Sequence, residues 1–240
     1  MSASKLDTAI CVPSYRANVH TGHLYQLAAL LAASGVWKFK LGLHFADSSN
    51  LDWGRNMLLW TAIREGYDWC LFVDADTFCT DGAAIVRMLE TANAQNAPVV
   101  AAPVKMRGRP GYNVVSIDEG GKPRLVEQKE FKDQIAWVRR VGTAFMAVRC
   151  GWIVKNWSWH TKADAQPWFQ TVPYLDDATG KLMPAKMGED YGFCDGVYQR
   201  GGRILIDGRF EPQHIHSTSE LAGVADLGFE IMPCPSEPLS

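Results

Sequence analysis

The chain has 240 residues, of which 47% are hydrophobic and 21% are charged, and its formal net charge is −2 at pH 7. This is the balance of an ordinary globular protein with enough chain for a sizeable core, and the weakly acidic total excludes a general attraction to nucleic acid or anionic lipid. The sequence shows no apolar stretch of signal-peptide or membrane-spanning length, so we expect a soluble, cytoplasmic protein.

The six cysteines predict free thiols. Cys11, Cys70 and Cys150 lie in or beside apolar runs, where a thiol behaves as a small hydrophobic group. The others show no close pairing, and the sequence contains no C-x-x-C motif. A zinc knuckle or a disulfide framework is therefore not expected.

The first half of the chain alternates strand and helix signals. The predicted strands cover residues 8–12, 39–45, 69–73 and 98–102. The predicted helices between them cover residues 20–33, 50–65 and 81–93. Asn50 or Asp52 caps the second helix, Gly66 follows its end, and Asp81 caps the third. This order predicts an α/β fold: a single domain with a mainly parallel central sheet flanked by helices.

The second half is less regular. The segment 103–135 is rich in Gly, Pro and charge, which predicts a small antiparallel or loop insertion. The predicted elements that follow are two short strands within 135–148 broken at Gly142-Thr143, a short amphipathic piece at 151–159, an irregular lid at 160–186, a helix at 189–200 and a strand at 203–207. We assign residues 1–216 to one domain and residues 217–240 to a loosely held C-terminal tail.

Two carboxylates follow the third predicted strand. Asp74 and Asp76 are two residues apart at the point where the buried run 69–73 ends. Hard oxygen ligands suit a divalent cation, and such a cation can hold a diphosphate. Side chains that leave the carboxyl end of a central strand point into the crevice where ligands bind in open α/β sheets. A solvated turn is the alternative.

Three further patterns add candidate residues. Glu189-Asp190 opens a predicted helix, whose macrodipole favours an ionised carboxylate, so Asp190 is either a general base or a helix cap. His214 and His216 share one side of an extended segment, which makes them candidate metal ligands or surface residues. Arg55 opens another helix, where it either contacts a nucleotide or is only solvated.

Taken in order, these patterns resemble the GT-A-fold glycosyltransferases, particularly the family-2-like group. The resemblance runs from about residue 8 to residue 216. The motifs that carry it are Val12-Pro13-Ser14-Tyr15, Asp47, Arg55-Asn56, Asp74-x-Asp76, the stretch 141–146, Gly188-Glu189-Asp190 and the late His214. D-x-D occurs widely by itself, but these motifs, in the family's order on a fitting strand-helix pattern, are strong together.

The resemblance implies a nucleoside-diphosphate-sugar donor and Mn²⁺ or Mg²⁺. It implies that Asp76 and His214 ligate the metal, while Asp74 contacts the ribose or sugar and reaches the metal. The residues implied for the nucleotide pocket are Pro13, Tyr15, Asp47, Arg55 and Asp74, and those implied for the acceptor side are Gly142, Thr143 and Glu189. Asp190 is implied as the base of an inverting displacement, or as a positioning group if the enzyme retains configuration.

Two positions depart from the family's pattern. Arg16 stands where an Asn or Asp is frequent, so the contacts to the donor base stay open. His216 stands where many relatives have Gly, so the choice between His214 and His216 as a ligand stays open.

Two alternatives belong to other classes. Haloacid-dehalogenase-like phosphatases also use D-x-D, but they want Thr at position 78, where this chain has Phe, and their pair follows the first strand. A non-catalytic nucleotide- or sugar-binding module is the other alternative, and nucleotide binding without turnover would identify it.

The acceptor is the least defined partner. The segment 105–110 with Lys122, Arg124, Arg139 and Arg140 predicts a local basic face near several tryptophans. Such a face suits a hydroxymethylated pyrimidine in DNA, as in phage-type DNA glycosyltransferases, while a glycan is the other acceptor considered. A solvated loop beside core tryptophans is the alternative interpretation, and the oligomeric state is open.

Overall fold

The computed structural model describes residues 6–14, 39–48, 50–79, 81–106, 111–117, 122–157, 167–171, 174–175, 182–183 and 188–214. At positions 78, 174–175, 182–183 and 214 the backbone alone is described. The predicted helix at 20–33 and the predicted tail at 217–240 lie outside the described residues, as do Tyr15 and His216.

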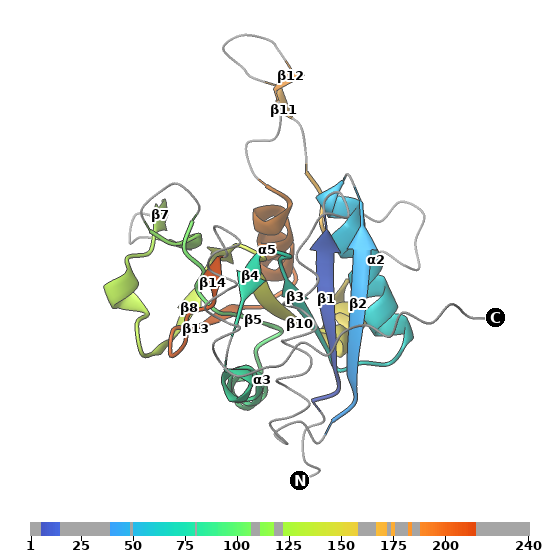
Figure 1. The fold of residues 1–240 in the computed structure, drawn as a ribbon. Helices are drawn as coiled ribbons and strands as arrows, with labels where there is room; N and C mark the ends of the chain where they lie inside the picture. The colour runs from blue at the N-terminus through green and yellow to red at the C-terminus, as the bar shows by residue number, and fades with distance from the viewer. Residues whose placement is uncertain are drawn as a thin grey trace, which may run out of the picture.

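In the described part of the first half, strands and helices follow one another in the predicted order, with one additional short strand at Thr77–Phe78 (Figure 1). The strands there are β1 (Thr8–Ser14), β2 (Leu41–Asp47), β3 (Trp69–Val73), β4 (Thr77–Phe78) and β5 (Val99–Ala101), and the helices are α2 (Leu51–Arg64) and α3 (Gly82–Ala94). The second half contains β6 (Val114–Ile117), β7 (Pro123–Leu125), η1 (Gln128–Glu130), β8 (Ile135–Val138), β9 (Arg140–Val141), β10 (Phe145–Arg149), α4 (Cys150–Asn156), β11 (Tyr174–Leu175), β12 (Leu182–Met183), α5 (Glu189–Gln199), β13 (Ile204–Asp207) and β14 (Gln213–His214).

The central sheet has seven strands in the order β2-β1-β3-β10-β5-β13-β8. Strands β2, β1, β3, β5 and β13 run in one direction, whereas β10 and β8 run against them. The sheet is therefore mixed but mostly parallel, which confirms the predicted fold class. Most ligand-binding edges of such sheets lie at the carboxyl ends of the parallel strands.

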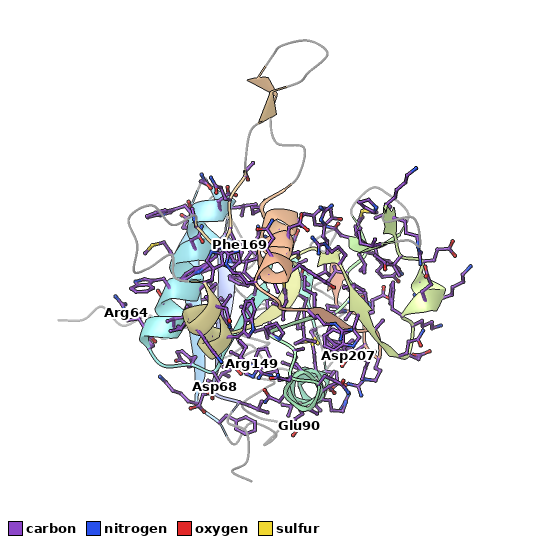
Figure 2. The ribbon with its side chains drawn as sticks, turned by 180° about the vertical axis from the view of Figure 1, so that it is seen from behind. Arg64, Asp68, Glu90, Arg149, Phe169 and Asp207 are labelled. Atoms are coloured by element: carbon purple, nitrogen blue, oxygen red, sulfur yellow. The ribbon has the colours of Figure 1, made fainter. Side chains whose placement is uncertain are left out.

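Helices cover both faces of this sheet. Helices α2, α4 and α5 pack on one face, where Leu59, Ile153 and Phe193 are buried with Phe72 of β3. Helix α3 packs on the other face through residues such as Leu89. Figure 2 shows α2, α4 and α5 side by side from behind the view of Figure 1. The strands between these two cores are buried on both sides, which explains their continuous apolar sequences.

Local sequence sets the ends of the helices. The Asn50 side chain accepts a hydrogen bond from the Trp53 N–H at 3.1 Å, so Asn50 rather than Asp52 caps α2. Gly66 follows α2 with a φ of 76°, a left-handed conformation that favours glycine. Asp81 caps α3 by accepting from the Ala84 N–H at 3.1 Å. These ends agree with the predicted ones to within one or two residues, and Asn50 is one of the two caps predicted for α2.

Residues 135–149 form three strands, not the two that the sequence predicts. Strand β8 pairs with β13 at one edge of the central sheet, β9 pairs with β6 in a small three-stranded sheet, and β10 inserts between β3 and β5. The prediction of two strands was wrong because the pairing partners lie far away in the sequence, where no local pattern reveals them. The insertion at 103–135 contains the predicted antiparallel hairpin, β6 with β7.

Part of the predicted lid is packed rather than loose. Trp168 and Phe169 are buried, and the Phe169 ring stacks on Phe193 of α5 with 4.4 Å between ring centroids. The Asn56 side chain of α2 accepts from the Phe169 N–H at 3.0 Å and donates to its carbonyl at 2.7 Å. Figure 2 shows Phe169 between α2 and α5. Burial of two aromatic rings outweighs the irregular, polar character of the surrounding sequence.

The described cysteines are buried and free, as expected. None of the helices in the described part of the chain combines the length and apolar character needed to cross a membrane.

Candidate active site at the carboxyl edge of the sheet

The carboxyl ends of neighbouring parallel strands bring the predicted site residues to one edge. Pro13 and Ser14 end β1 opposite Ala46 and Asp47 of β2, and the Ser14 hydroxyl donates to Asp47 Oδ1 at 3.5 Å. Asp74 follows β3, and its N–H donates to the Ala144 carbonyl at 2.9 Å. The turn before β10 therefore lies directly beside the end of β3.

A pocket of about 270 Å³ lies at this edge. Its lining brings together six residues that the sequence predicts for the site: Arg55, Asp74, Gly142, Thr143, Glu189 and Asp190. The predicted residues Pro13, Asp47 and Asp76 do not line it. Tyr15, His216 and the side chain of His214 lie outside the description. The pocket thus joins the predicted acceptor side to the end of β3, while β1 and β2 end farther along the same edge.

Arg55 connects three elements beneath the pocket. Its guanidinium is buried in the first turns of α2, donates to Asp74 Oδ1 at 2.9 Å and contacts Glu189 of α5 through a short ion pair. Burial alone lowers the pKa of Arg55, but Asp74 and Glu189 outweigh it and raise that pKa above its usual value. Arg55 is therefore a permanent positive charge that two carboxylates already hold.

Asp190 is a carboxylate with a raised pKa. It lies in the first turn of α5 and is mostly buried, and burial together with the neighbouring Glu189 raises its pKa from 3.8 to about 6. The Tyr191 N–H donates to Asp190 Oδ1 at 2.7 Å and Arg55 lies nearby, and both oppose that rise in pKa. The sequence predicts that the helix N-terminus favours the ionised carboxylate. In the structure burial raises the pKa despite the helix, but Asp190 is still mostly ionised at pH 7. A pKa near neutrality suits a general base.

Asn113 is a pocket residue that no sequence pattern revealed. It precedes β6 in the insertion, and its Nδ2 lies 3.4 Å from Asp190 Oδ2. Gly142 provides the space for it, because a Cβ at position 142 would lie 2.6 Å from Asn113 Nδ2. Lys105 and Met106, which follow β5, also line the pocket. Only the small residue at position 142 signalled a close approach, and it did not show which side chain would approach.

The late histidine segment returns to the end of β3. Strand β14 pairs with β4, and this pairing places the His214 backbone opposite Thr77, the residue after Asp76. Two carboxylates and an imidazole are a mixed oxygen and nitrogen donor set that suits Mn²⁺. Among the side chains that the structure describes, no three His, Cys, Asp or Glu groups gather as a metal site. The backbone register is thus the observation that links His214 to the D-x-D pair.

The charge of the pocket favours cations and neutral groups over polyanions. Among the described residues, its lining carries three carboxylates, those of Asp74, Glu189 and Asp190, against the cations Arg55 and Lys105. Lys105 also pairs with Glu211 at 3.3 Å. An anionic acceptor would meet this excess of negative charge, whereas a hydroxyl group would not.

The predicted basic face is largely neutralised in its described part. Arg139 and Arg140 both pair with Asp195 of α5, at 3.1 and 2.6 Å, and Arg124 pairs with Glu130 at 2.5 Å. Arg107 and Arg109 lie outside the described residues. Two of the tryptophans in the second half of the chain, Trp157 and Trp168, are buried in the core. These observations favour the interpretation of paired surface charges beside core tryptophans.

Comparisons with known proteins identify the fold. A scan of protein families finds no match, and a search of curated proteins finds none either. The solved structures that match most of the chain include the following two. A197 from STIV has a TM-score of 0.58 and 14% identity over 88% of this chain and 86% of that chain. GalNAc-T7, crystallised with UDP, GalNAc and Mn²⁺, has a TM-score of 0.53 and 11% identity over 88% of this chain and 44% of that chain. At these identities the likeness concerns the fold alone, and the protein has a GT-A-like fold.

Proposed function

We propose that this protein is a metal-dependent glycosyltransferase that moves a sugar from a nucleoside-diphosphate sugar to an acceptor hydroxyl. The observation that carries the proposal is the pocket in which Asp74, at the end of β3, and Asp190, at the start of α5, share one lining. A donor site and a proton acceptor are the two parts that this reaction needs at one place.

The donor would bind along the carboxyl edge of β2, β1 and β3. In this proposal Asp76 and His214 hold Mn²⁺ or Mg²⁺ together with Asp74, and Pro13, Tyr15, Asp47 and Arg55 surround the nucleotide. A bound divalent cation would neutralise the charge that builds on the departing nucleoside diphosphate. The GT-A-like fold and the pairing of His214 with Thr77 support this assignment. The neighbour crystallised with UDP, GalNAc and Mn²⁺ supports the choice of ligands.

Asp190 would accept the proton of the acceptor hydroxyl. Its carboxylate faces the pocket, and its pKa of about 6 leaves it ionised at pH 7 yet basic enough to take a proton. Gly142, Thr143 and Glu189 would form the acceptor side around it. The excess of carboxylates in the described part of the pocket lining supports a neutral polyhydroxyl acceptor such as a glycan over a polyanion such as DNA.

Calorimetric titration of UDP- and GDP-sugars, with and without Mn²⁺, tests the donor site. We expect Mn²⁺-dependent binding to the wild type that is lost in Asp76→Asn. The matched control is Asp81→Asn, which removes a carboxylate five positions away and keeps the cap of α3, because Asn caps helices about as well as Asp.

The same titration distinguishes the alternatives. If the wild type binds none of these nucleotides in either condition, the donor assignment is wrong and the phosphatase becomes the stronger candidate. If Asp76→Asn keeps Mn²⁺-dependent binding, the metal lies elsewhere. Tight binding without sugar transfer to any acceptor would identify a non-catalytic module.

A further inference from the structure

Asn113 contacts the residues around Asp190 from three directions. Its carbonyl accepts a hydrogen bond from the Gly142 N–H at 2.9 Å, which fixes the backbone beside the pocket. Its side-chain Oδ1 accepts a short hydrogen bond from the Tyr191 hydroxyl of α5. Its side-chain Nδ2 then faces Asp190 Oδ2 at 3.4 Å. A single residue of the insertion therefore reaches both the β9–β10 turn and the first turn of α5.

The tyrosine determines which end of the amide faces the carboxylate. A phenol with a neutral hydroxyl donates to the amide oxygen, which leaves the NH₂ end for Asp190. Burial raises the pKa of Tyr191 to about 12, so this hydroxyl keeps its proton across the neutral range. Were the amide reversed, its oxygen would face the carboxylate and repel it.

The two oxygens of Asp190 consequently have different surroundings. Oδ1 accepts from the Tyr191 N–H at 2.7 Å, whereas among the described residues the contact of Oδ2 is the longer one to Asn113. A carboxylate oxygen has two lone pairs, so Oδ2 keeps one acceptor position beside the pocket. An acceptor hydroxyl would meet this oxygen at a fixed orientation.

We propose that Asn113 is a positioning residue that orients the Asp190 carboxylate toward the acceptor, with Tyr191 holding the amide in the required direction. The inference rests on the proposed function for what the orientation serves, but the contact between Asn113 and Asp190 can be measured without any transfer reaction. Gly142 makes this arrangement possible, because its lack of a side chain leaves the space that the Asn113 amide fills.

The charged and titratable groups around Asp190 are known for the described residues. Burial raises the pKa of Asp190 most, Glu189 and Asp74 raise it further, and Arg55 lowers it. Tyr191 is the titratable side chain that holds Asn113. Replacing Asn113 leaves these groups in place, so a change in the pKa of Asp190 would report the loss of the amide. A hydrogen bond to the ionised form of an acid lowers its pKa, and removal of the donor raises it.

The experiment follows the Asp190 carboxyl carbon by NMR titration in metal-free buffer, with Asp190→Asn used to assign the signal. In Asn113→Ala we expect the pKa of Asp190 to rise by roughly half a unit to one unit, given the length of the contact. In Tyr191→Phe we expect a smaller rise, because the amide remains but is free to reverse. The matched control is Tyr198→Phe on the same helix, whose hydroxyl donates to the Val138 carbonyl, and it should leave the pKa of Asp190 unchanged.

Two results would overturn the inference. The first is an unchanged pKa of Asp190 in a folded Asn113→Ala protein. The second applies if that variant does not fold: a pKa in Tyr191→Phe that equals the value in the Tyr198→Phe control. If donor binding fails while the pKa of Asp190 rises as expected, the proposed function fails and the contact stands. Where transfer is measured, a loss of kcat with unchanged donor KM in Asn113→Ala separates positioning from a general loss of structure.

Discussion

At the scale of single residues, Asp190 combines a functional arrangement with a cost to stability. Its carboxyl group loses its proton near pH 3.8 in an unfolded chain and near pH 6 in the folded protein. The fold therefore disfavours the ionised form, and the folded protein binds more protons than the unfolded chain between these two values. It follows that the contribution of Asp190 to stability falls as pH rises from about 4 to 6 and stays low above that range.

Asp190→Asn should relieve this cost. We expect the variant to be more stable than the wild type by about 1 to 3 kcal/mol at pH 7.5, with little difference near pH 4, because a neutral amide has no ionised form to disfavour. Urea unfolding at several pH values measures the difference. A gain that does not depend on pH would contradict the explanation.

The matched control is Asp195→Asn on the same helix. Asp195 pairs with Arg139 and Arg140, so its replacement leaves two cations without their carboxylate and should destabilise the protein at pH 7.5. The two substitutions on this helix are thus expected to change the stability of the protein in opposite directions. A gain in stability on replacing Asp190, beside a loss on replacing Asp195, is expected if Asp190 serves function and Asp195 serves stability.

At the scale of elements, α5 packs so closely on its neighbours that one of its glycines has no room for a side chain. A Cβ at Gly196 would lie 2.2 Å from the Trp157 ring, which stacks on Phe193 one turn earlier in α5. Arg200 covers the same ring at 4.0 Å. The indole is fixed on several sides, so it cannot move aside for an added methyl group.

Gly196→Ala should therefore destabilise the protein by about 1 to 3 kcal/mol, although alanine is the better helix former. Gly151→Ala in α4 is the control, since a Cβ there meets nothing within 4 Å. It should be neutral or stabilise by about 0.5 kcal/mol. Thermal unfolding followed by circular dichroism compares the two, and equal effects would show that packing against Trp157 is not what excludes a side chain at position 196.

The order of elements was accessible from sequence because it depends on local patterns. The apolar run 69–73 and the caps at Asn50 and Asp81 determine their elements within a few residues. The same holds for the site residues at element ends, such as Asp74 and Asp190, since the carboxyl edge of a sheet gathers them. Asn113 was missed because its position depends on the pairing of β6 with β9, a contact between distant segments.

Strand β10 was predicted, but its reversed direction was not, for the same reason. Its apolar sequence indicates a strand but does not reveal the direction in which that strand runs or its neighbours. The sequence indicated that Arg55 belongs to the site, because it lies at the start of a helix. It did not reveal the two carboxylates that pair with Arg55, which come from the end of β3 and from α5. Local sequence thus indicates which residues belong to the edge, and tertiary packing decides how they pair.

At the scale of the whole molecule, the thiols are distributed through both cores. Burial raises the pKa of Cys79 to about 11 and that of Cys194 to about 12, so these groups are neutral and inaccessible in the folded protein. The described thiols that are buried and free are Cys11, Cys70, Cys79, Cys150 and Cys194.

These five thiols should report the opening of the whole domain. With Cys234 replaced by serine, we expect iodoacetamide to label the native protein very slowly and the urea-unfolded protein at once, with the five sites reacting together. Mass spectrometry of partly labelled samples distinguishes molecules with no label from molecules with five. An abundant species with a single label would contradict this expectation and would locate a local opening.

The position of β10 also has a consequence for folding during synthesis on the ribosome. In the described sheet, β3 and β5 are not hydrogen-bonded to each other; β10, which is completed at Arg149, lies between them and pairs with both. A nascent chain that has passed β5 therefore carries the fragment β2-β1-β3, whose β3 edge is unpaired, and the apolar strand β5, whose two neighbours β10 and β13 both follow it in the sequence. At ordinary synthesis speeds this interval lasts roughly 2 to 10 s. During those seconds the unpaired β3 edge and strand β5 offer apolar binding sites for molecular chaperones, and β5 joins the sheet only when β10 arrives.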